Sequence, residues 1–196
     1  MEKTSYHHGN LKLIILNEAL EQLKSNDFKE LSFRLIAKNI GVASSAPYNH
    51  FKNKDHLLQE IILKGKRFLI ESMNISKKKS NLPSQQLALI GKAYLKFSIE
   101  HKQLFNLMFS EKNKELIMLT NEIVLQFKLI IAKKFKEGKR FRITESGAAI
   151  AAWSMIHGLS AIVNKTNKDY LEEKLEKSLS EIFIEMSAIW GKGVTN

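Results

Sequence analysis

Residues 32–51 read SFRLIAKNIGVASSAPYNHF, and this stretch predicts two short helices joined by a tight turn. Ser32 is a good N-cap for a helix over residues 33–40, because its hydroxyl can accept a hydrogen bond from a backbone N–H that lacks a partner in the helix. Gly41 is suited to end that helix, since glycine adopts the left-handed backbone at little steric cost. A second short helix is expected near residues 44–50.

The side chains of these two helices are suited to a DNA-binding surface. Four apolar residues have the spacing that packs the helices together: Ile36, Ala37, Ile40 and Val42. The second helix would present its polar groups to base edges and phosphates in the major groove. These groups belong to Ser44, Ser45, Tyr48, Asn49 and His50. Charge for phosphate contacts would come from Arg34, Lys38, Lys52 and Lys54. Small helix pairs without a DNA function can carry similar residues, so the pattern alone leaves both interpretations open.

The region around this motif resembles the signature of TetR/AcrR-type transcriptional regulators over about residues 6–58. The likeness is carried by LSFRLIA at 31–37, Gly41-Val42, YNHFKNK at 48–54 and Leu57-Leu58. Tyr6–Leu11 and Ala46–Tyr48 resemble one subgroup of that family. The resemblance implies an N-terminal DNA-binding domain in which Tyr48 and Lys54 hold phosphates. It also implies base or backbone contacts by Arg34, Ser44, Ser45, Asn49 and His50.

One residue departs from the family pattern. The family usually has a serine where this chain has Ala43, and that serine caps the recognition helix. An alanine side chain cannot cap a helix. We therefore expect the cap to shift by one residue to Ser44. Pro47 would then lie in the first turn, where a missing N–H costs least.

Helical spacing recurs along the rest of the chain, and no alternating strand pattern with flanking turn pairs is found. Residues 9–25 predict a first helix with one apolar stripe, formed by Leu11, Ile15, Ala19 and Leu23. Asn53 is expected to cap a long helix over about 54–79, with Asp55 favoured by the helix dipole in its first turn. The polar run 77–81 interrupts the helical pattern.

Pro83 is expected to open the next helix, a position where its missing N–H is harmless. A short apolar piece, Leu104–Phe109, follows it, and then three longer helices at about 112–137, 145–164 and 169–190. Gly138 is expected to end the first of these three, and Thr144 to cap the second. The sequence therefore predicts an all-α fold of about nine helices. A three-helix helix-turn-helix domain would cover 1–56, and a helical ligand-binding and dimerisation domain would cover 57–196.

The last two long helices carry patterns that favour tight packing. The helix at 145–164 has small residues at a spacing of four and three, which places them on one face: Gly147, Ala151, Ser154, Gly158 and Ala161. Packing within one subunit and packing across a dimer both fit this face. The helix at 169–190 has a near-heptad stripe of Leu171, Leu175, Leu179, Ile182, Met186 and Ile189. The family resemblance implies a homodimer through these two helices, and a two-fold dimer suits half-sites about 34–36 Å apart.

The segment from Trp153 to Gly158 resembles the Trp-His-Gly (WHG) signature of one class of C-terminal domain in the family. Trp153 and His157 share a helix face, so they either border a ligand cavity or form a hydrogen-bonded core pair. Aromatic and methionine residues nearby suit a hydrophobic ligand, although the same residues also suit a plain core. The candidate ligand-binding residues are Phe97, Phe105, Met108, Phe109, Phe127, Trp153 and His157.

The whole-chain composition excludes several classes of protein. The chain has no cysteine, which excludes disulfides and thiolate metal sites. The first ten residues lack the apolar segment of a secretion signal, and no apolar run reaches the roughly 18 residues of a membrane span. We therefore expect a cytoplasmic protein without a membrane partner. No phosphate-binding loop, nucleophile elbow or metal spacing among the six histidines is present. The sequence thus predicts no enzyme, metal or cofactor.

The formal net charge of +11 favours a polyanionic partner, either nucleic acid or an anionic membrane. Together with the motif, it favours a transcriptional regulator. We expect a repressor released from a palindromic double-stranded operator by a small, largely hydrophobic effector. Two alternatives also fit the sequence. One is an amphipathic helical protein that binds anionic membranes or acidic partners through its lysines. The other keeps the DNA-binding head but is an activator or a ligand-blind DNA binder.

Overall fold

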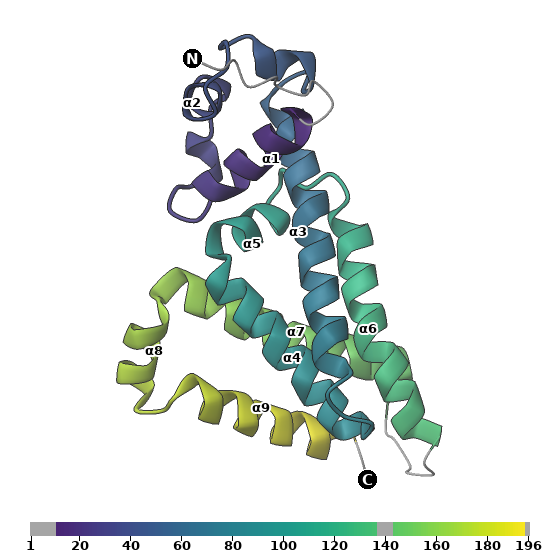
Figure 1. Cartoon of the computed structure of the whole chain (residues 1–196). Helices are drawn as coiled ribbons and strands as arrows, with labels where there is room; N and C mark the ends of the chain where they lie inside the picture. The colour runs from purple at the N-terminus through teal and green to yellow at the C-terminus, as the bar shows by residue number, and fades with distance from the viewer. Residues whose placement is uncertain (1–10, 137–142, 195–196) are drawn as a thin grey trace. The chain divides into compact units, whose positions relative to one another are not determined.

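The structure is a computed structural model that describes residues 11–136 and 143–194. Every regular element in these ranges is helical (Figure 1), which confirms the predicted all-α fold. The α-helices are α1 (Leu11–Gln22), α2 (Phe33–Asn39), α3 (Lys54–Lys77), α4 (Pro83–Glu100), α5 (Lys102–Met108), α6 (Leu116–Lys136), α7 (Glu145–Thr166), α8 (Lys168–Leu175) and α9 (Leu179–Val194). Two 3₁₀ helices, η1 (Phe28–Glu30) and η2 (Ala46–Asn49), complete the described elements.

The chain divides into two compact units. The first unit consists of the chain up to Lys66 together with His101–Lys114. It therefore holds α1, α2, α5 and the N-terminal half of α3. The second unit consists of Arg67–Glu100 and the chain from Glu115 onward. This division differs from the expected domains 1–56 and 57–196, because α3 contributes residues to both units and α5 joins the first.

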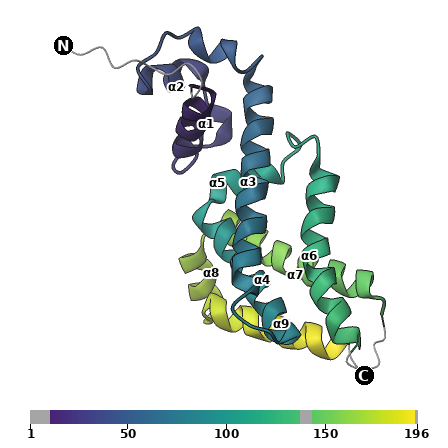
Figure 2. The ribbon, with the colours of Figure 1, turned by 45° about the vertical axis from the view of Figure 1, so that its right-hand side comes forward.

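Apolar residues from α1, α2, α5 and the N-terminal half of α3 form the core of the first unit. Both views show α1 and α2 beside the N-terminal part of α3 (Figures 1 and 2). The predicted stripe of α1 is buried at Leu11, Ile15, Ala19 and Leu23. Ile36 and Ala37 of α2 are buried as well, as are Phe51 and Leu57. The predicted packing face of the helix pair is therefore confirmed at its centre, while Ile40 and Val42 are half-buried.

In the second unit, α4, α6 and α7 contact one another and form the centre. Its buried residues include Tyr94 of α4, Phe127 of α6 and Ile156 of α7. The last helix, α9, buries Phe183 and Trp190. Gly91 of α4 allows a close approach, because a Cβ there would lie 3.1 Å from the ring of Phe183. A glycine at this position therefore lets α9 pack against α4.

The expected single helix at 169–190 is wrong, because the chain forms two helices there. Glu176 ends α8 with a left-handed backbone, φ 50°. Ser178 then starts α9 with a reciprocal cap. Its Oγ accepts from the backbone N–H of Glu181 at 3.2 Å, and the Glu181 carboxylate accepts from the backbone N–H of Ser178 at 2.8 Å. This is the capping box of a Ser-x-x-Glu sequence. Residues 178–181 therefore carry the sequence signal for the start of a new helix.

The break also divides the predicted apolar stripe of that segment. Leu179 is buried, whereas Leu175 and Ile189 are 50% and 66% exposed. The residues that anchor α9 are Phe183 and Trp190 instead, and Trp190 Nε1 donates to the Ala148 carbonyl oxygen at 3.2 Å. The stripe therefore does not form one continuous face.

Several predicted helix ends are confirmed. Thr144 caps α7, because its Oγ1 accepts from the backbone N–H of Gly147 at 3.1 Å. Asn53 caps α3, and its Oδ1 accepts from the backbone N–H of His56 at 2.9 Å. Pro83 opens α4 as expected. Gly138 lies outside the described residues.

Among the described helices, α7 is the one that is long and apolar enough to cross a membrane by length and composition alone. It also contributes to the core of the second unit through Ala148, Ala149, Ile156, Leu159 and Val163. A core helix meets the same criteria as a membrane span, so one such helix is weak evidence for a span.

Candidate DNA-binding surface

The first helix of the motif is built as its sequence predicts. The Oγ of Ser32 accepts from the backbone N–H of Leu35 at 3.1 Å and so caps α2. Gly41 follows α2 with φ +72°, the left-handed conformation expected at this position. The backbone N–H of Val42 then donates to the Ala37 carbonyl oxygen at 3.0 Å, which closes the turn.

The second helix exists, but it is a 3₁₀ helix that spans only Ala46–Asn49. The expected shift of the cap to Ser44 does not occur. Ser45 precedes the helix and makes no side-chain cap hydrogen bond. Backbone hydrogen bonds of the 3₁₀ type hold the segment together instead. In one of them, the Tyr48 N–H donates to the Ser45 carbonyl oxygen at 3.1 Å. Ala43 supplies no capping side chain, and Pro47 lies in the first turn as expected.

The residues predicted to contact DNA are largely accessible. Arg34, Ser44, Ser45 and Asn49 are exposed, and Tyr48 is 60% exposed. His50 is half-buried. Behind this row, Pro47 and Phe51 are buried and fix the segment to the core of the first unit. The structure therefore presents polar side chains on a buried support.

The ring of Tyr48 packs edge-on against Phe33 of α2, with ring centroids 4.8 Å apart. Phe33 in turn lies 6.4 Å from the ring of Phe51. Edge-to-face pairs of this kind hold an aromatic side chain in place. The body of Tyr48 is therefore anchored, while most of its surface remains open to a partner.

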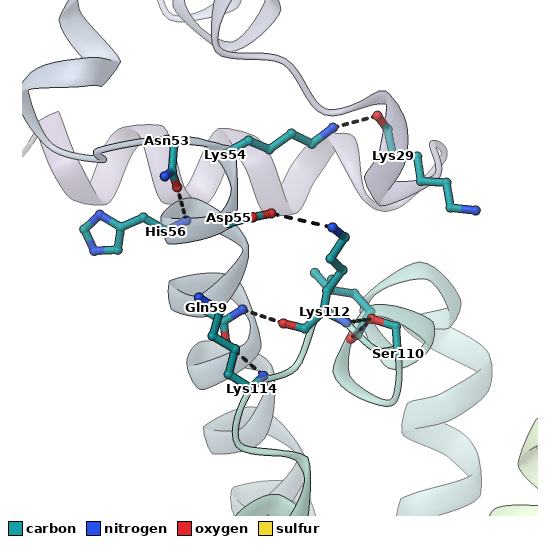
Figure 3. Close-up of polar contacts among 10 residues, drawn as sticks. Lys29, Asn53, Lys54, Asp55, His56, Gln59, Ser110, Lys112 and Lys114 are labelled. Carbon is teal, nitrogen blue, oxygen red and sulfur yellow. Dashed lines mark hydrogen bonds and ion pairs between the residues drawn. The ribbon is translucent and has the colours of Figure 1, made fainter.

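Lys54 lies at the start of α3, and its side chain extends toward Lys29 (Figure 3). Its Nζ donates to the Lys29 carbonyl oxygen at 2.6 Å. Partial burial lowers the pKa of Lys54, while nearby Asp27 and Asp55 oppose that shift. An ammonium group has three N–H donors, so one bond to Lys29 leaves donors for a phosphate.

His56 links the start of α3 to the segment before it. Its Nδ1 accepts from the backbone N–H of Lys52 at 3.2 Å, and its own backbone N–H is capped by Asn53. Its ring also lies 5.6 Å from that of Phe51. These contacts position Lys52 and Lys54, the two cations that follow the recognition segment.

Gln59 of α3 binds the loop after α5, an interaction that the sequence did not indicate. Its Nε2 donates to the Lys112 carbonyl oxygen at 2.6 Å, and its Oε1 accepts from the backbone N–H of Lys114 at 3.4 Å (Figure 3). The Lys112 ammonium lies 3.9 Å from the Asp55 carboxylate. The loop at residues 110–114 is thus tied to the first turns of α3.

The seven candidate ligand-binding residues fall in both units. Phe105, Met108 and Phe109 belong to the first unit, whereas the other four belong to the second. In the second unit, Tyr94 Oη and His157 Nδ1 are 2.8 Å apart, and the Trp153 ring stacks on His157 with centroids 5.1 Å apart.

Burial affects both titratable groups of this pair. It lowers the pKa of His157. It also raises the pKa of Tyr94, and the nearby Trp153 indole offsets part of that rise. The Trp153 indole N–H nevertheless completes no hydrogen bond of good geometry. The His157 ring is therefore held inside the second unit by the Tyr94 hydroxyl and the Trp153 ring.

A cavity of about 150 Å³ lies elsewhere in the second unit, between α4, α6, α7 and α9. Of the seven candidates, Phe127 lines it. Residues that the sequence reasoning missed, including Phe183 and Trp190 of α9, form much of its wall. No group of three or more His, Cys, Asp or Glu residues within the described ranges could hold a metal ion.

The outward faces of α7 and α9 carry apolar side chains. Ile150 and Ile162 of α7 are 52% and 50% exposed, and Ile184 and Ile189 of α9 are 57% and 66% exposed. The small-residue stripe lies on the same side of α7. A Cβ on Gly158 would meet no atom within 4 Å. At Gly158, the stripe therefore makes no close contact within the described chain.

Comparisons with known proteins identify the N-terminal domain. Residues 15–61 match the family described as bacterial regulatory proteins, tetR family. These residues include most of α1, all of α2, the 3₁₀ recognition segment and the start of α3. The family is one of regulators and not of enzymes.

Three individual proteins extend the comparison. The nucleoid occlusion factor SlmA of Aliivibrio fischeri is 27% identical over 154 residues, which cover 74% of this chain and 79% of that protein. A solved structure of a protein of unknown function from Rhodococcus sp. RHA1 matches with a TM-score of 0.83 at 20% identity, over 99% of this chain and 100% of that one. The structure of AibR in complex with isovaleryl coenzyme A and operator DNA matches with a TM-score of 0.59 at 15% identity, over 79% and 85%. The two structures share the fold of this chain.

Proposed function

We propose that this chain, whose residues 15–61 match the tetR family of bacterial regulatory proteins, is a homodimeric transcriptional repressor. It acts in the cytoplasm on double-stranded operator DNA, without a cofactor, and releases the operator when a small, largely hydrophobic effector binds. The observation that carries this proposal is the exposed row of Ser44, Ser45, Tyr48 and Asn49 on a buried support. AibR, a protein of the same fold, was solved in complex with isovaleryl coenzyme A and operator DNA.

The DNA contacts follow from the chemistry of that row. Ser44, Ser45, Asn49 and His50 offer the short donors and acceptors that read base edges in the major groove. Tyr48 and Lys54 hold phosphates, as does Arg34 where it does not reach a base. Phosphate contacts position the motif and make its affinity depend on salt.

A dimer is proposed through the outward faces of α7 and α9. Each face exposes two isoleucines, and burial of such side chains stabilises an interface. The open Gly158 allows the backbones of two copies to approach closely. Such a dimer would present two recognition segments to the two halves of a palindrome.

Effector control is proposed to act through α3, because this helix contains residues of both units. The effector must bind the state that does not fit DNA more tightly than the state that does, and its differential affinity sets the extent of release. Gln59 ties α3 to the loop that leads into α6. It is therefore a candidate element of this coupling.

Gel shift with DNA from around the gene of this protein tests the proposal. We expect the wild-type chain to retard this DNA and Tyr48→Ala to abolish the retardation. Tyr170→Ala is the matched control, because Tyr170 of α8 is also exposed and lies outside the motif. Liposome co-sedimentation addresses the membrane alternative. Binding to anionic vesicles that survives Tyr48→Ala, with no retardation of DNA by wild type, would contradict the regulator.

A further inference from the structure

The cavity of the second unit has a mainly apolar wall. Phe127, Phe183 and Trp190 contribute rings to it, and Met155 and Met186 contribute flexible side chains. Apolar walls of this kind favour an apolar body, and methionine adapts to its shape. The cavity therefore fits a hydrophobic molecule and disfavours a strongly hydrated one.

Lys134 is the one ionisable residue of the described chain that lines this cavity. It is half-buried, and its Nζ lies 6.0 Å from the centroid of the Trp190 ring. No carboxylate among the described residues forms an ion pair with Lys134, and the ion pairs found in the second unit involve other lysines. An ammonium in such partly desolvated surroundings favours a ligand that brings a negative charge.

The remaining polar groups of the wall are few. Trp190 Nε1 already donates to the Ala148 carbonyl oxygen. Ser84 and Ser187 supply hydroxyls, and the Ser187 hydroxyl donates to the Phe183 carbonyl oxygen at 2.8 Å. One cation and two hydroxyls suit a ligand with a single small anionic group rather than several polar groups.

We propose that this cavity binds a small apolar carboxylate, with its carboxylate at Lys134 and its apolar body among Phe127, Phe183 and Met155. In naming this class as the effector, the inference rests on the proposed regulator function. The volume of about 150 Å³ equals that of an engineered protein cavity that accepts benzene. The apolar part of the ligand is therefore about the size of a benzene ring or a short alkyl chain.

Calorimetric titration of the full chain tests this proposal. The probes are benzoate and the straight-chain carboxylates from butanoate to octanoate, and benzyl alcohol and the matching alcohols are their uncharged counterparts. We expect at least one acid to bind about tenfold or more tightly than its alcohol. Lys134→Gln should remove this preference and Lys134→Arg should retain it. Ala88→Leu, which adds bulk to the cavity wall, should abolish binding of both.

Lys133→Gln is the matched control, because Lys133 is the exposed neighbour of Lys134 and does not line the cavity. The melting temperature of each variant establishes that it is folded. Three results would overturn the proposal: equal affinity for acids and alcohols, no binding of any probe, or a loss of the acid preference in Lys133→Gln as large as that in Lys134→Gln. Gel shifts on the same samples separate the two claims. Operator binding without probe binding overturns the carboxylate site alone, and probe binding without operator binding overturns the regulator alone.

Discussion

Tyr48 and Phe33 meet edge to face, with ring centroids 4.8 Å apart, so the most exposed aromatic of the recognition segment rests on a buried ring of α2. This contact separates two roles. Phe33 stabilises the motif, whereas the hydroxyl of Tyr48 remains for a phosphate. Substitutions at the two positions should therefore have different effects.

Tyr48→Phe keeps the ring contact and removes the hydroxyl. We expect an unchanged melting temperature and an operator affinity weaker by about 1 kcal/mol, or roughly fivefold, which is typical of one lost hydrogen bond. Phe33→Ala should instead lower the free energy of unfolding by about 3 kcal/mol, because it empties a buried aromatic position. Urea unfolding and gel shift measure the two quantities. A Tyr48→Phe variant that unfolds more easily and binds DNA normally would contradict these roles.

Gly41→Ala tests the backbone of the turn. No atom lies within 4 Å of a Cβ at this position, so the cost is conformational and not steric. At φ +72° a non-glycine residue costs about 1–2 kcal/mol. We expect urea unfolding to show a loss of that size. Gly193→Ala in α9, where φ is not positive and space is also open, should be neutral or stabilising.

Gln59→Ala tests the tie between α3 and the loop at 110–114. We expect the variant to bind the operator normally without effector. The fall in operator affinity that the effector causes should be about fivefold smaller than in wild type, a coupling change of about 1 kcal/mol. Gel shift with and without effector measures both quantities. Lys112→Ala is the control, because it removes only an exposed ion pair and leaves the carbonyl that Gln59 binds. If both variants respond to the effector like wild type, Gln59 has no role in coupling.

Ile189→Glu tests the proposed dimer face, with Ile150→Glu as its counterpart on α7. A carboxylate at either position would be desolvated in an interface but is tolerated in a monomer. Sedimentation should therefore show monomers with unchanged helical content. Ile117→Glu on α6 is the matched control, because Ile117 is 78% exposed and lies outside this face. Dimers that persist in both variants would place the interface elsewhere.

The pH dependence of stability should report on His157. Burial lowers its pKa in the folded state, so the unfolded chain binds more protons as the pH falls below the ordinary histidine value of about 6.5. The stability of the wild-type chain should therefore decrease between pH 7 and pH 5. His157→Gln should show a smaller decrease over the same range, as measured by thermal unfolding. An identical decrease in both proteins would assign the effect to other groups.

Local signals made the helix-turn-helix predictable. Ser32, Gly41 and Asn53 each act within one turn of the chain, so their roles can be inferred from neighbouring residues. The apolar pattern does not predict the break before α9, because a stripe with near-heptad spacing runs across Glu176. The Ser178–Glu181 capping box was a readable signal of that break. The 3₁₀ form of the recognition segment is not predicted by its sequence, although Ala43 offers no capping side chain for a regular helix.

The cavity could not be predicted in the same way. Its wall combines residues of four helices that are distant in sequence, and which faces meet depends on the packing of the whole unit. Lys134 follows another lysine in the sequence, Lys133, which is exposed. The position of Lys134 beside Trp190 becomes visible only once α6 and α9 are placed together.

Footprinting and gel shift with DNA from around the gene, at two salt concentrations, test the central claim most directly. We expect a protected palindrome whose affinity falls steeply with salt, because Lys and Arg side chains displace counterions from the phosphates. Sequence-blind binding, or binding that is insensitive to salt, would contradict a repressor that reads an operator. The fold would then remain established, and membranes or acidic proteins would become the partners to test.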